Sequence, residues 1–320
     1  PLVLDLDNDG IELVSLTGAG AVMFDVSNSG FAKATGWVTG GDGLLAIDLN
    51  ENGRIENGGE LFGNTGGNAN GFLSLASRDT DGNGKIDAND ADWNKLRVWI
   101  DTNGNGYTDA GELHNLADLN ISSIDLNYSN VNYSVAGNQI LQESTFTING
   151  VSQTISDVYF AADNTNTVYA QNYTLNPTAL LMPTIRGYGE LPDLLVAMSM
   201  DDTGTGNLLA QVMDFAGKDF DDIFVADGSV LEAIREVIYR WAGVDSVSPS
   251  SRGVLVDGQE LAVIEKLMGE SYTSRWGSPD PNGNIAANSL IKAFGEFINH
   301  TYAVLLSQTT AGELFTGDIY

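Results

Sequence analysis

Residues 101–112, DTNGNGYTDAGE, have the spacing of an EF-hand-type calcium loop. Such a loop places oxygen ligands at positions 1, 3, 5, 7, 9 and 12, and a glycine at position 6 where the chain turns sharply. The turn position is Gly106. The oxygen donors are Asp101, Asn103, Asn105, the backbone carbonyl of Tyr107, Asp109 and the carboxylate of Glu112. This stretch therefore predicts a complete calcium site.

Residues 79–90, DTDGNGKIDAND, repeat the pattern with Gly84 at the turn. The expected ligands are Asp79, Asp81, Asn83, the backbone carbonyl of Lys85, Asp87 and Asp90. The last position holds aspartate, which is shorter than the bidentate glutamate of the usual loop. We therefore expect weaker or differently hydrated calcium binding here.

Two further stretches are incomplete versions of the loop. In residues 48–60, DLNENGRIENGGE, the last acid falls at position 13, so the loop must contain one extra residue. Its expected ligands are Asp48, Asn50, Asn52, the carbonyl of Arg54, Glu56 and Glu60. Residues 5–12, DLDNDGIE, form a truncated site with nothing acidic at the twelfth position, open to completion from elsewhere in the chain. Its expected ligands are Asp5, Asp7, Asp9 and Glu12.

The remaining acidic stretches fit the ligand pattern poorly. Residues 25–30, DVSNSG, keep the first aspartate but have lost most carboxylates, which favours a plain turn. The segments DDTGTGN (201–207) and DFDDIFVADG (219–228) are interpreted as solvated helix ends. We therefore expect the chain to bind about two to four calcium ions, all in its first half.

The composition agrees with a cation as the natural partner. The chain has 43 acidic and 14 basic residues, a net charge of -29, which argues against nucleic acid and anionic membranes as partners. It has no cysteine, so disulfides and a thiol nucleophile are excluded. No apolar run approaches the roughly 20 residues of a transmembrane helix. Metal sites are thus the expected source of extra stability.

The sequence gives little evidence for a group of residues that would catalyse a multiple-turnover reaction. The G-x-S-x-G pattern and the phosphate-loop pattern are both absent. The two histidines, His114 and His300, are interpreted as surface or hydrogen-bonded side chains rather than catalytic bases. A carboxylate pair for glycoside hydrolysis cannot be identified among so many acids.

Apolar spacing predicts an α+β chain in two domains. Residues 1–175 carry short alternating runs such as AVMFDV and GLLAID, typical of short strands joined by liganded turns. Asn149-Gly150 predicts a hairpin, and short helices are expected at 70–77 and around 90–99. Residues 176–320 have apolar residues at helical spacing and predict a mostly helical domain. Its clearest helix is 229–241, where Ser229 and Glu232 have capping-box spacing.

Ordered motifs over residues 1–165 resemble the self-processing module of the FrpC-like proteins, which are secreted bacterial proteins of the RTX group. The motifs are PLVLDLDNDGIELV, GWVTGGDGLLAIDLNENGRIENGGELFGN, the segment 79–113 that contains both complete loops, and ISSIDLNY. The second half, with RGYGELPDL and YRWAGVDSVSPSSRG, is similar to a segment that follows such modules in very large calcium-binding RTX proteins.

The resemblance implies calcium-triggered cleavage of an Asp-Pro bond, with Pro1 as the first residue of the product. In that chemistry the aspartate side chain attacks its own peptide carbonyl, and water or a lysine amine of another protein opens the resulting anhydride. Two features depart from the family pattern. The preceding aspartate is outside this sequence, and GGxGxD repeats are missing apart from a weak echo in TGGDG (39–43).

The leading interpretation is a calcium-binding, extracellular or cell-surface bacterial module, attached to the remainder of a larger polypeptide. At most it performs a single self-cleavage before Pro1. Two alternatives stay open: a calcium-stiffened structural or adhesin spacer without cleavage activity, and a secreted hydrolase.

Overall fold

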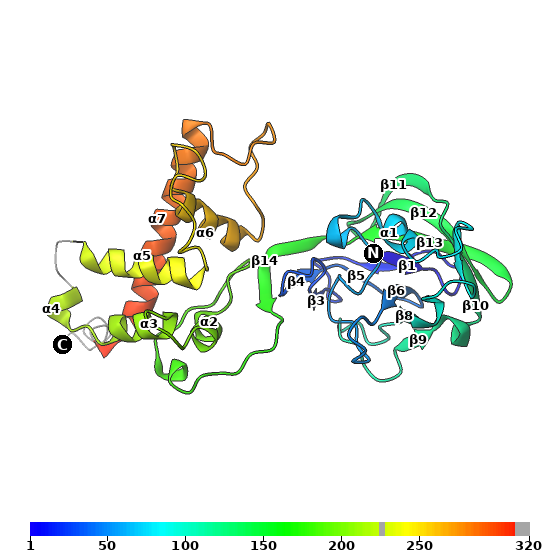
Figure 1. Cartoon of the computed structure of the whole chain (residues 1–320), viewed down its shortest axis with the longest axis horizontal. Coiled ribbons are helices and arrows are strands. Elements are labelled where there is room, and N and C mark those ends of the chain that lie inside the picture. Colours follow the sequence, from blue (N-terminus) through cyan, green and yellow to red (C-terminus); the bar gives the residue numbers. More distant parts are fainter. Residues whose placement is uncertain (224–227, 311–320) are drawn as a thin grey trace. The chain divides into compact units, whose positions relative to one another are not determined.

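The computed structural model describes residues 1–223 and 228–310, and the chain divides into two compact units (Figure 1). Unit 1 comprises residues 1–163 and unit 2 begins at Asn164. Strands dominate unit 1 and helices dominate unit 2, which confirms the α+β class. Residues 164–175, which the sequence pattern assigned to the first domain, lie in unit 2. Residues 224–227 of the acidic stretch 219–228 lie outside the described residues.

Among the described residues, unit 1 is built on a nine-stranded antiparallel sheet in the order β7-β10-β12-β13-β1-β6-β8-β9, with β11 paired to β12. The strands are β1 (Leu2–Leu4), β6 (Gly43–Ile47), β7 (Lys85–Asp87), β8 (Leu96–Trp99), β9 (Leu113–Asn115), β10 (Ile121–Asp125), β11 (Ser129–Val135), β12 (Asn138–Ile148) and β13 (Val151–Tyr159). The first strand of the chain thus lies in the middle of the sheet, between β13 and β6 (Figure 1).

Both faces of the sheet are buried, because successive side chains of a strand point to opposite sides. Leu2 and Leu4 pack on one side with Phe72, while Val3 packs on the other side with Trp37. One face is covered by α1 (Gly71–Ala76) and short 3-10 turns. The other face is covered by β2 (Leu13–Val14), β3 (Val22–Phe24) and β5 (Trp37–Val38). Strand β3 pairs with β4 (Phe31–Thr35), and β2 pairs with β5.

Local sequence signals account for several elements. The predicted hairpin joins β12 to β13, and Asn149 and Gly150 have φ values of 51° and 76°. These positive values are what a two-residue turn of this type requires. Helix α1 confirms the helix expected at 70–77, and the side chain of Asn70 caps it by accepting the N–H of Leu73 at 2.9 Å.

The helix expected around 90–99 is wrong. Residues 93–95 make only a 3-10 turn, and Leu96–Trp99 form β8, which pairs with β6. Short apolar runs fit helix and strand alike, and here cross-strand pairing decides. Val98 of β8 lies between β6 and the edge strand β9 and is fully buried.

Unit 2 is helical, as the sequence predicts. Its helices are α2 (Leu194–Met200), α3 (Leu208–Ala216), α4 (Phe220–Ile223), α5 (Ser229–Trp241), α6 (Gly258–Met268) and α7 (Asn284–Leu306). Strand β14 (Ala162–Tyr169) crosses the boundary between the units. The expected capping box of α5 does not start the helix, because its N-cap is Gly228 and Ser229 is its first residue.

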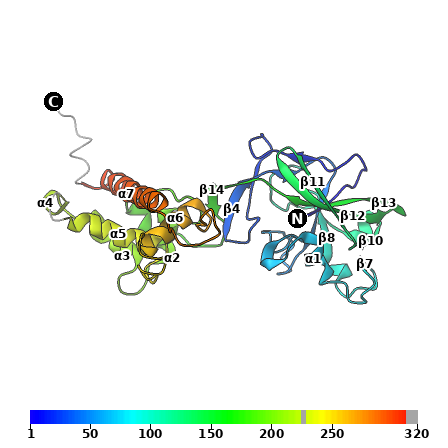
Figure 2. The ribbon, with the colours of Figure 1, turned by 90° about the horizontal axis from the view of Figure 1, so that it is seen from above.

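The core of unit 2 forms where α5 and α6 pack against the long α7 (Figure 2). Ile234 and Ile238 of α5 are fully buried there, beside Phe294 and Ile298 of α7. Within the described residues, none of the helices has the length and apolar content needed to cross a membrane.

Candidate calcium sites and the N-terminal pocket

The loop at 101–112 connects β8 to β9 and folds around its first residue. Oδ1 of Asp101 accepts the N–H of Gly104 and Oδ2 accepts the N–H of Gly106, both at 2.8 Å. Gly106 has a φ of 73°, and a Cβ there would lie 2.9 Å from Cβ of Val22. Only glycine fits this turn, as the loop pattern requires.

The side chains at positions 3, 5 and 9 of this loop converge on one another. The amides of Asn103 and Asn105 donate to Oδ2 of Asp109 at 2.8 and 2.9 Å. These two hydrogen bonds lower the pKa of Asp109. The structure therefore brings the side chains of the predicted ligands 103, 105 and 109 into contact with one another.

The loop at 79–90 has the same construction. Oδ2 of Asp79 accepts the N–H of Gly84 at 2.9 Å. One carboxylate oxygen from each of Asp79, Asp81 and Asp90 lies within 4.8 Å of the others. Two oxygens bound to one calcium ion at about 2.4 Å are at most ~4.8 Å apart, so this spacing suits a shared ion.

The loop at 48–60 closes in spite of its extra residue. Oδ2 of Asp48 accepts the N–H of Gly53 at 2.7 Å, and the amides of Asn50 and Asn52 donate to Oε2 of Glu56. The thirteenth residue, Glu60, is buried with 3% exposure. Burial raises its pKa, although backbone hydrogen bonds oppose the change.

In these three loops the last carboxylate bridges the same two backbone amides, those of the second and the ninth residue. The bonds are Thr102 and Asp109 to Glu112 (both 3.0 Å), Thr80 and Asp87 to Asp90 (2.6 and 2.9 Å), and Leu49 and Glu56 to Glu60 (3.1 and 2.9 Å). Each loop is thus a ring closed by one buried acid. The extra residue at 48–60 is absorbed without breaking this closure.

The first loop, 5–12, folds like the others at its start. Asp5 accepts the N–H groups of Asn8 at 2.7 Å and Gly10 at 3.2 Å. Oxygens of Asp7, Asp9 and Glu12 lie within 4.8 Å of one another. A second such group contains Asp5, Asp7 and a residue that the ligand pattern did not single out, Asp42. Burial, with the charges of Asp5 and Asp7, raises the pKa of Asp42 to about 7.

The turn at 25–30 keeps the loop shape without the ligands. Asp25 accepts the N–H groups of Ser29 at 2.9 Å and Gly30 at 2.7 Å. Serines occupy positions 27 and 29, where the other loops have Asp or Asn. A hydroxyl is a poorer donor to calcium than a carboxylate, so this turn remains interpreted as structural.

A different site lies at Pro1. Its nitrogen is 3.4 Å from Oδ1 of Asp157, a carboxylate with 1% exposure, and Oδ2 of Asp157 accepts the N–H of Gly71 at 2.6 Å. Pairing of β1 with β13 creates this contact, because Leu2 is opposite Asp157. The carbonyl of Pro1 also accepts the N–H of Val158 at 2.8 Å. Adjacent residues of β13 therefore hold both the nitrogen and the carbonyl group of Pro1.

A pocket of about 410 Å³ opens beside Pro1. Its lining includes Ser27, Thr65, Asp157 and Tyr159. Burial, with the charge of Asp157, raises the pKa of Tyr159 to about 12, so its hydroxyl stays protonated near neutral pH. Pro1 therefore lines a pocket together with these polar residues and with apolar ones such as Phe160.

Sequence reasoning named Pro1 but missed Asp157 and Asp42. No local signal marks Asp157, which lies in an ordinary alternating strand. The glycines around Asp42 were a signal, since TGGDG concentrates close-approach residues next to an acid. The two histidines lie in different units, His114 on β9 and His300 on α7.

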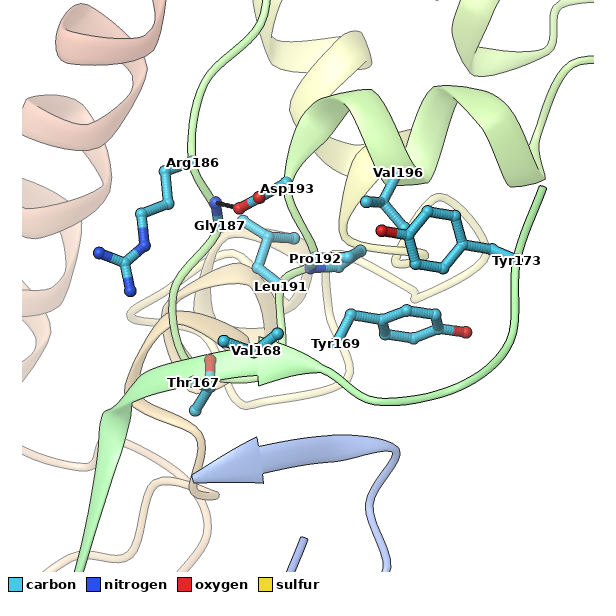
Figure 3. Close-up of a pocket in the computed structure, with 10 residues that line it drawn as sticks. All are labelled: Thr167, Val168, Tyr169, Tyr173, Arg186, Gly187, Leu191, Pro192, Asp193 and Val196. Atoms are coloured by element: carbon cyan, nitrogen blue, oxygen red, sulfur yellow. Dashed lines mark hydrogen bonds between the residues drawn. The ribbon is translucent and has the colours of Figure 1, made fainter. Parts of the chain in front are cut away.

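Unit 2 has a smaller pocket of about 80 Å³ between β14 and the start of α2 (Figure 3). Arg186 lies on the opposite side from the rings of Tyr169 and Tyr173, and the N–H of Gly187 donates to Asp193 at 2.8 Å. Small-molecule sites usually have about 300–1,000 Å³, so this volume holds little more than water.

Comparison with known proteins gives a family match within unit 1 and a curated relative whose alignment is longer than unit 1. A family model described as the SPM domain matches residues 2–161. A curated relative, the iron-regulated protein FrpA of Neisseria meningitidis serogroup C, is 36% identical over 254 residues. That alignment covers 77% of this chain and 22% of FrpA, so the chain spans about a fifth of its relative.

Proposed function

Because the chain belongs to the SPM domain family, we propose that unit 1 is a calcium-dependent self-processing module that cleaves the peptide bond before Pro1. The observation that carries this proposal is the buried contact of the Pro1 nitrogen with Asp157 at 3.4 Å. A nitrogen that must leave as an amine needs an acid beside it. Asp157 is such a group, and it lies at the edge of a pocket with room for the residue before Pro1.

The proposed reaction needs an aspartate before Pro1. Its side-chain carboxylate attacks its own backbone carbonyl carbon, a C–O bond forms, and the bond to the Pro1 nitrogen breaks. The electron pair stays on nitrogen, which takes up a proton through the carboxyl group of Asp157. The products are a cyclic anhydride and a prolyl amine paired with the Asp157 carboxylate.

Water then opens the anhydride to two carboxylic acids. A lysine amine of another protein can open it instead and form an amide bond, which would join the upstream piece to that protein. The module contributes positioning, which is worth several kcal/mol when reacting atoms are held at contact distance. General acid assistance adds about 10²- to 10⁴-fold.

We propose that calcium stabilises the folded module and takes no direct part in breaking the peptide bond before Pro1. The donor sets at 5–12, 48–60, 79–90 and 101–112 consist of hard oxygen atoms, which suit calcium and do not suit soft metals. With bound cations these crowded carboxylates no longer repel one another. The module would therefore fold fully where calcium is abundant, which fits an extracellular or cell-surface part of a large RTX-type protein.

The test is a tagged protein in which Asp precedes Pro1. Millimolar calcium should release the tag, and replacing that Asp by Asn should prevent release. The released chain should begin at Pro1, as mass spectrometry would establish. If the tagged protein stays intact for a day in calcium while circular dichroism shows it folded, the structural-spacer alternative replaces this proposal.

A further inference from the structure

We propose that Asp42 is the closing ligand of a calcium site whose other ligands come from loop 5–12, and that this site fastens β1 to β6. The loop pattern expects the closing acid at the twelfth position, which is Leu16 here. The chain supplies the acid from the TGGDG segment instead. The site is therefore assembled from two segments about 30 residues apart.

Asp42 accepts a backbone amide of the loop, as the closing acids of the other loops do. Its Oδ2 accepts the N–H of Glu12 at 2.7 Å. Glu12 is the eighth residue of loop 5–12, whereas the closing acids of the other loops accept the N–H of the ninth residue. Those acids use their other oxygen for the N–H of the second residue, and Asp42 does not.

One oxygen of Asp42 is left without a hydrogen bond. The residue has 2% exposure, and its Oδ1 is buried with no partner among the described residues. Leaving a buried acceptor of this kind unsatisfied destabilises the folded state. Oxygens of Asp5 and Asp7 lie within 4.8 Å of an oxygen of Asp42. A divalent cation with oxygen preference satisfies all three carboxylates at once.

Two glycines make this approach possible. A Cβ on Gly41 would lie 2.8 Å from Oδ2 of Asp7, and a Cβ on Gly40 would collide with the carboxylate of Glu12. Gly40 also has a φ of 71°, which disfavours other residues. The segment that resembled a weak RTX repeat is therefore explained as the second half of the first calcium site.

The position of this site connects it to the cleavage site. Asp5 directly follows β1 and Asp42 directly precedes β6, and Leu4 is paired with Gly43. A cation shared by Asp5 and Asp42 joins the two strands just beyond their last paired residues. Strand β1 begins next to Pro1, so the ion would fix the strand that carries the scissile bond. This connection to cleavage rests on the proposed function, whereas the metal site stands on its own geometry.

The metal site is tested on the chain as it is, by its calcium stoichiometry. Asp42→Asn keeps the shape of the side chain but removes the charge, and calorimetry should show one ion fewer per chain. The matched control is Asp25→Asn, which changes a buried acid that also accepts two loop amides but lacks acidic neighbours. Full stoichiometry and affinity in Asp42→Asn would overturn the proposal.

A second variant decides the question if Asp42→Asn fails to fold. The chain has no cysteine, so Asp42→Cys introduces a single thiol, and thiolates favour soft cations such as cadmium. Cadmium should give a thiolate charge-transfer band at one equivalent, and excess calcium should reduce it. Asp25→Cys should give a far weaker band. Equal bands in the two variants, or none in Asp42→Cys, would count against Asp42 as a ligand.

The connection to Pro1 is tested separately in the tagged protein. Asp42→Asn should need at least tenfold more calcium for tag release than the unchanged sequence. Equal calcium requirements would refute the connection while leaving the metal site intact. If the unchanged tagged protein does not cleave at all, the proposed function fails, and the binding measurements above still decide the metal site.

Discussion

The indole N–H of Trp37 donates a hydrogen bond to Oδ2 of Asp101 at 2.8 Å. This bond joins the aromatic core of unit 1 to Asp101, the first of the proposed calcium ligands in loop 101–112. Trp37 is fully buried, and its ring centroid lies 5.0 Å from that of Phe24 and 5.4 Å from that of Trp99. The indole therefore reports directly on the loop.

We predict that calcium changes the tryptophan fluorescence mainly through Trp37. A calcium ion bound to Asp101 partly neutralises its carboxylate. This weakens the electric field at the indole nitrogen of Trp37 and makes the surroundings of the ring more rigid. Trp37→Phe should remove most of the calcium-dependent signal in a fluorescence titration. Trp276→Phe should leave it intact, since Trp276 is in unit 2 and 86% exposed. Similar losses in both variants would contradict the assignment.

The loops should differ in calcium affinity. Glu112→Ala removes the bidentate ligand of loop 101–112 and should cost the most affinity of any single loop change. Asp25→Ala should leave calcium affinity nearly unchanged, although it also deletes an acid that accepts two amides. Calorimetry of the two variants measures the contrast. Equal losses of affinity would refute the ranking.

Calcium removal should destabilise unit 1 selectively. An ion at tenfold its dissociation constant contributes about 1.4 kcal/mol, so four sites would contribute roughly 5–6 kcal/mol. Whole domains have only about 5–15 kcal/mol. A chelator should therefore lower the first melting transition sharply and leave the helical transition in place. A single unchanged melt in excess chelator, with metal analysis showing no bound calcium, would disprove this dependence.

Cleavage should depend on Asp157. Asp157→Asn keeps the acceptor for the Gly71 amide but cannot protonate the leaving nitrogen, so tag release should slow about 10²- to 10⁴-fold. Calcium stoichiometry should not change, which separates this effect from misfolding. Asp25→Asn serves as the control and should cleave at the normal rate. A normal rate in Asp157→Asn would remove the residue from the mechanism.

Unit 2 should show an acid-sensitive ion pair. Arg240 donates to both oxygens of Asp201 at 2.6 and 3.0 Å, and this pairing lowers the pKa of Asp201. A carboxyl whose pKa falls on folding adds stability above its usual pKa and loses that contribution as the pH drops through the lowered value. Asp201→Asn should therefore cost about 1–2 kcal/mol at neutral pH.

The same variant should cost almost nothing in strong acid, where Asp201 is protonated in the unchanged protein as well. Denaturant melts of unit 2 at the two pH values measure the difference. Glu296→Gln breaks an exposed pair with Lys292 and should have little effect at either pH. A pH-independent loss in Asp201→Asn would show that the ion pair is not its cause.

The closed shape of the loops at 48–60, 79–90 and 101–112 could be predicted because the residues that build each loop are close together in the sequence. The proposed ligand positions follow from spacing alone, and so does the glycine turn at Gly106, which the structure confirms. The hairpin at Asn149 was equally local. Strand β8 could not be predicted, since a four-residue apolar run is decided by its partner β6 rather than by its own pattern.

The residues that sequence reasoning missed depend on contacts between distant segments. Asp157 reaches Pro1 only through the pairing of β1 with β13. Asp42 reaches Asp5 only because β6 lies on the other side of β1. The contact of Asp157 leaves no trace in the local sequence pattern, and the glycines around Asp42 indicate a close approach without identifying its partner. The spacing of residues along the sequence defines a loop, but it does not indicate which strand will lie next to that loop in the fold.

The central place of β1 also sets an order of events. Its partner β13 begins at Val151, so almost all of unit 1 must be present before β1 has both neighbours. Sheets built from such distant pairings form slowly, because the loop entropy is lost before the contacts form. Under the proposed function, cleavage would then occur only after the whole module has folded. The upstream piece would be released only from chains whose entire module has been synthesised, exported and folded.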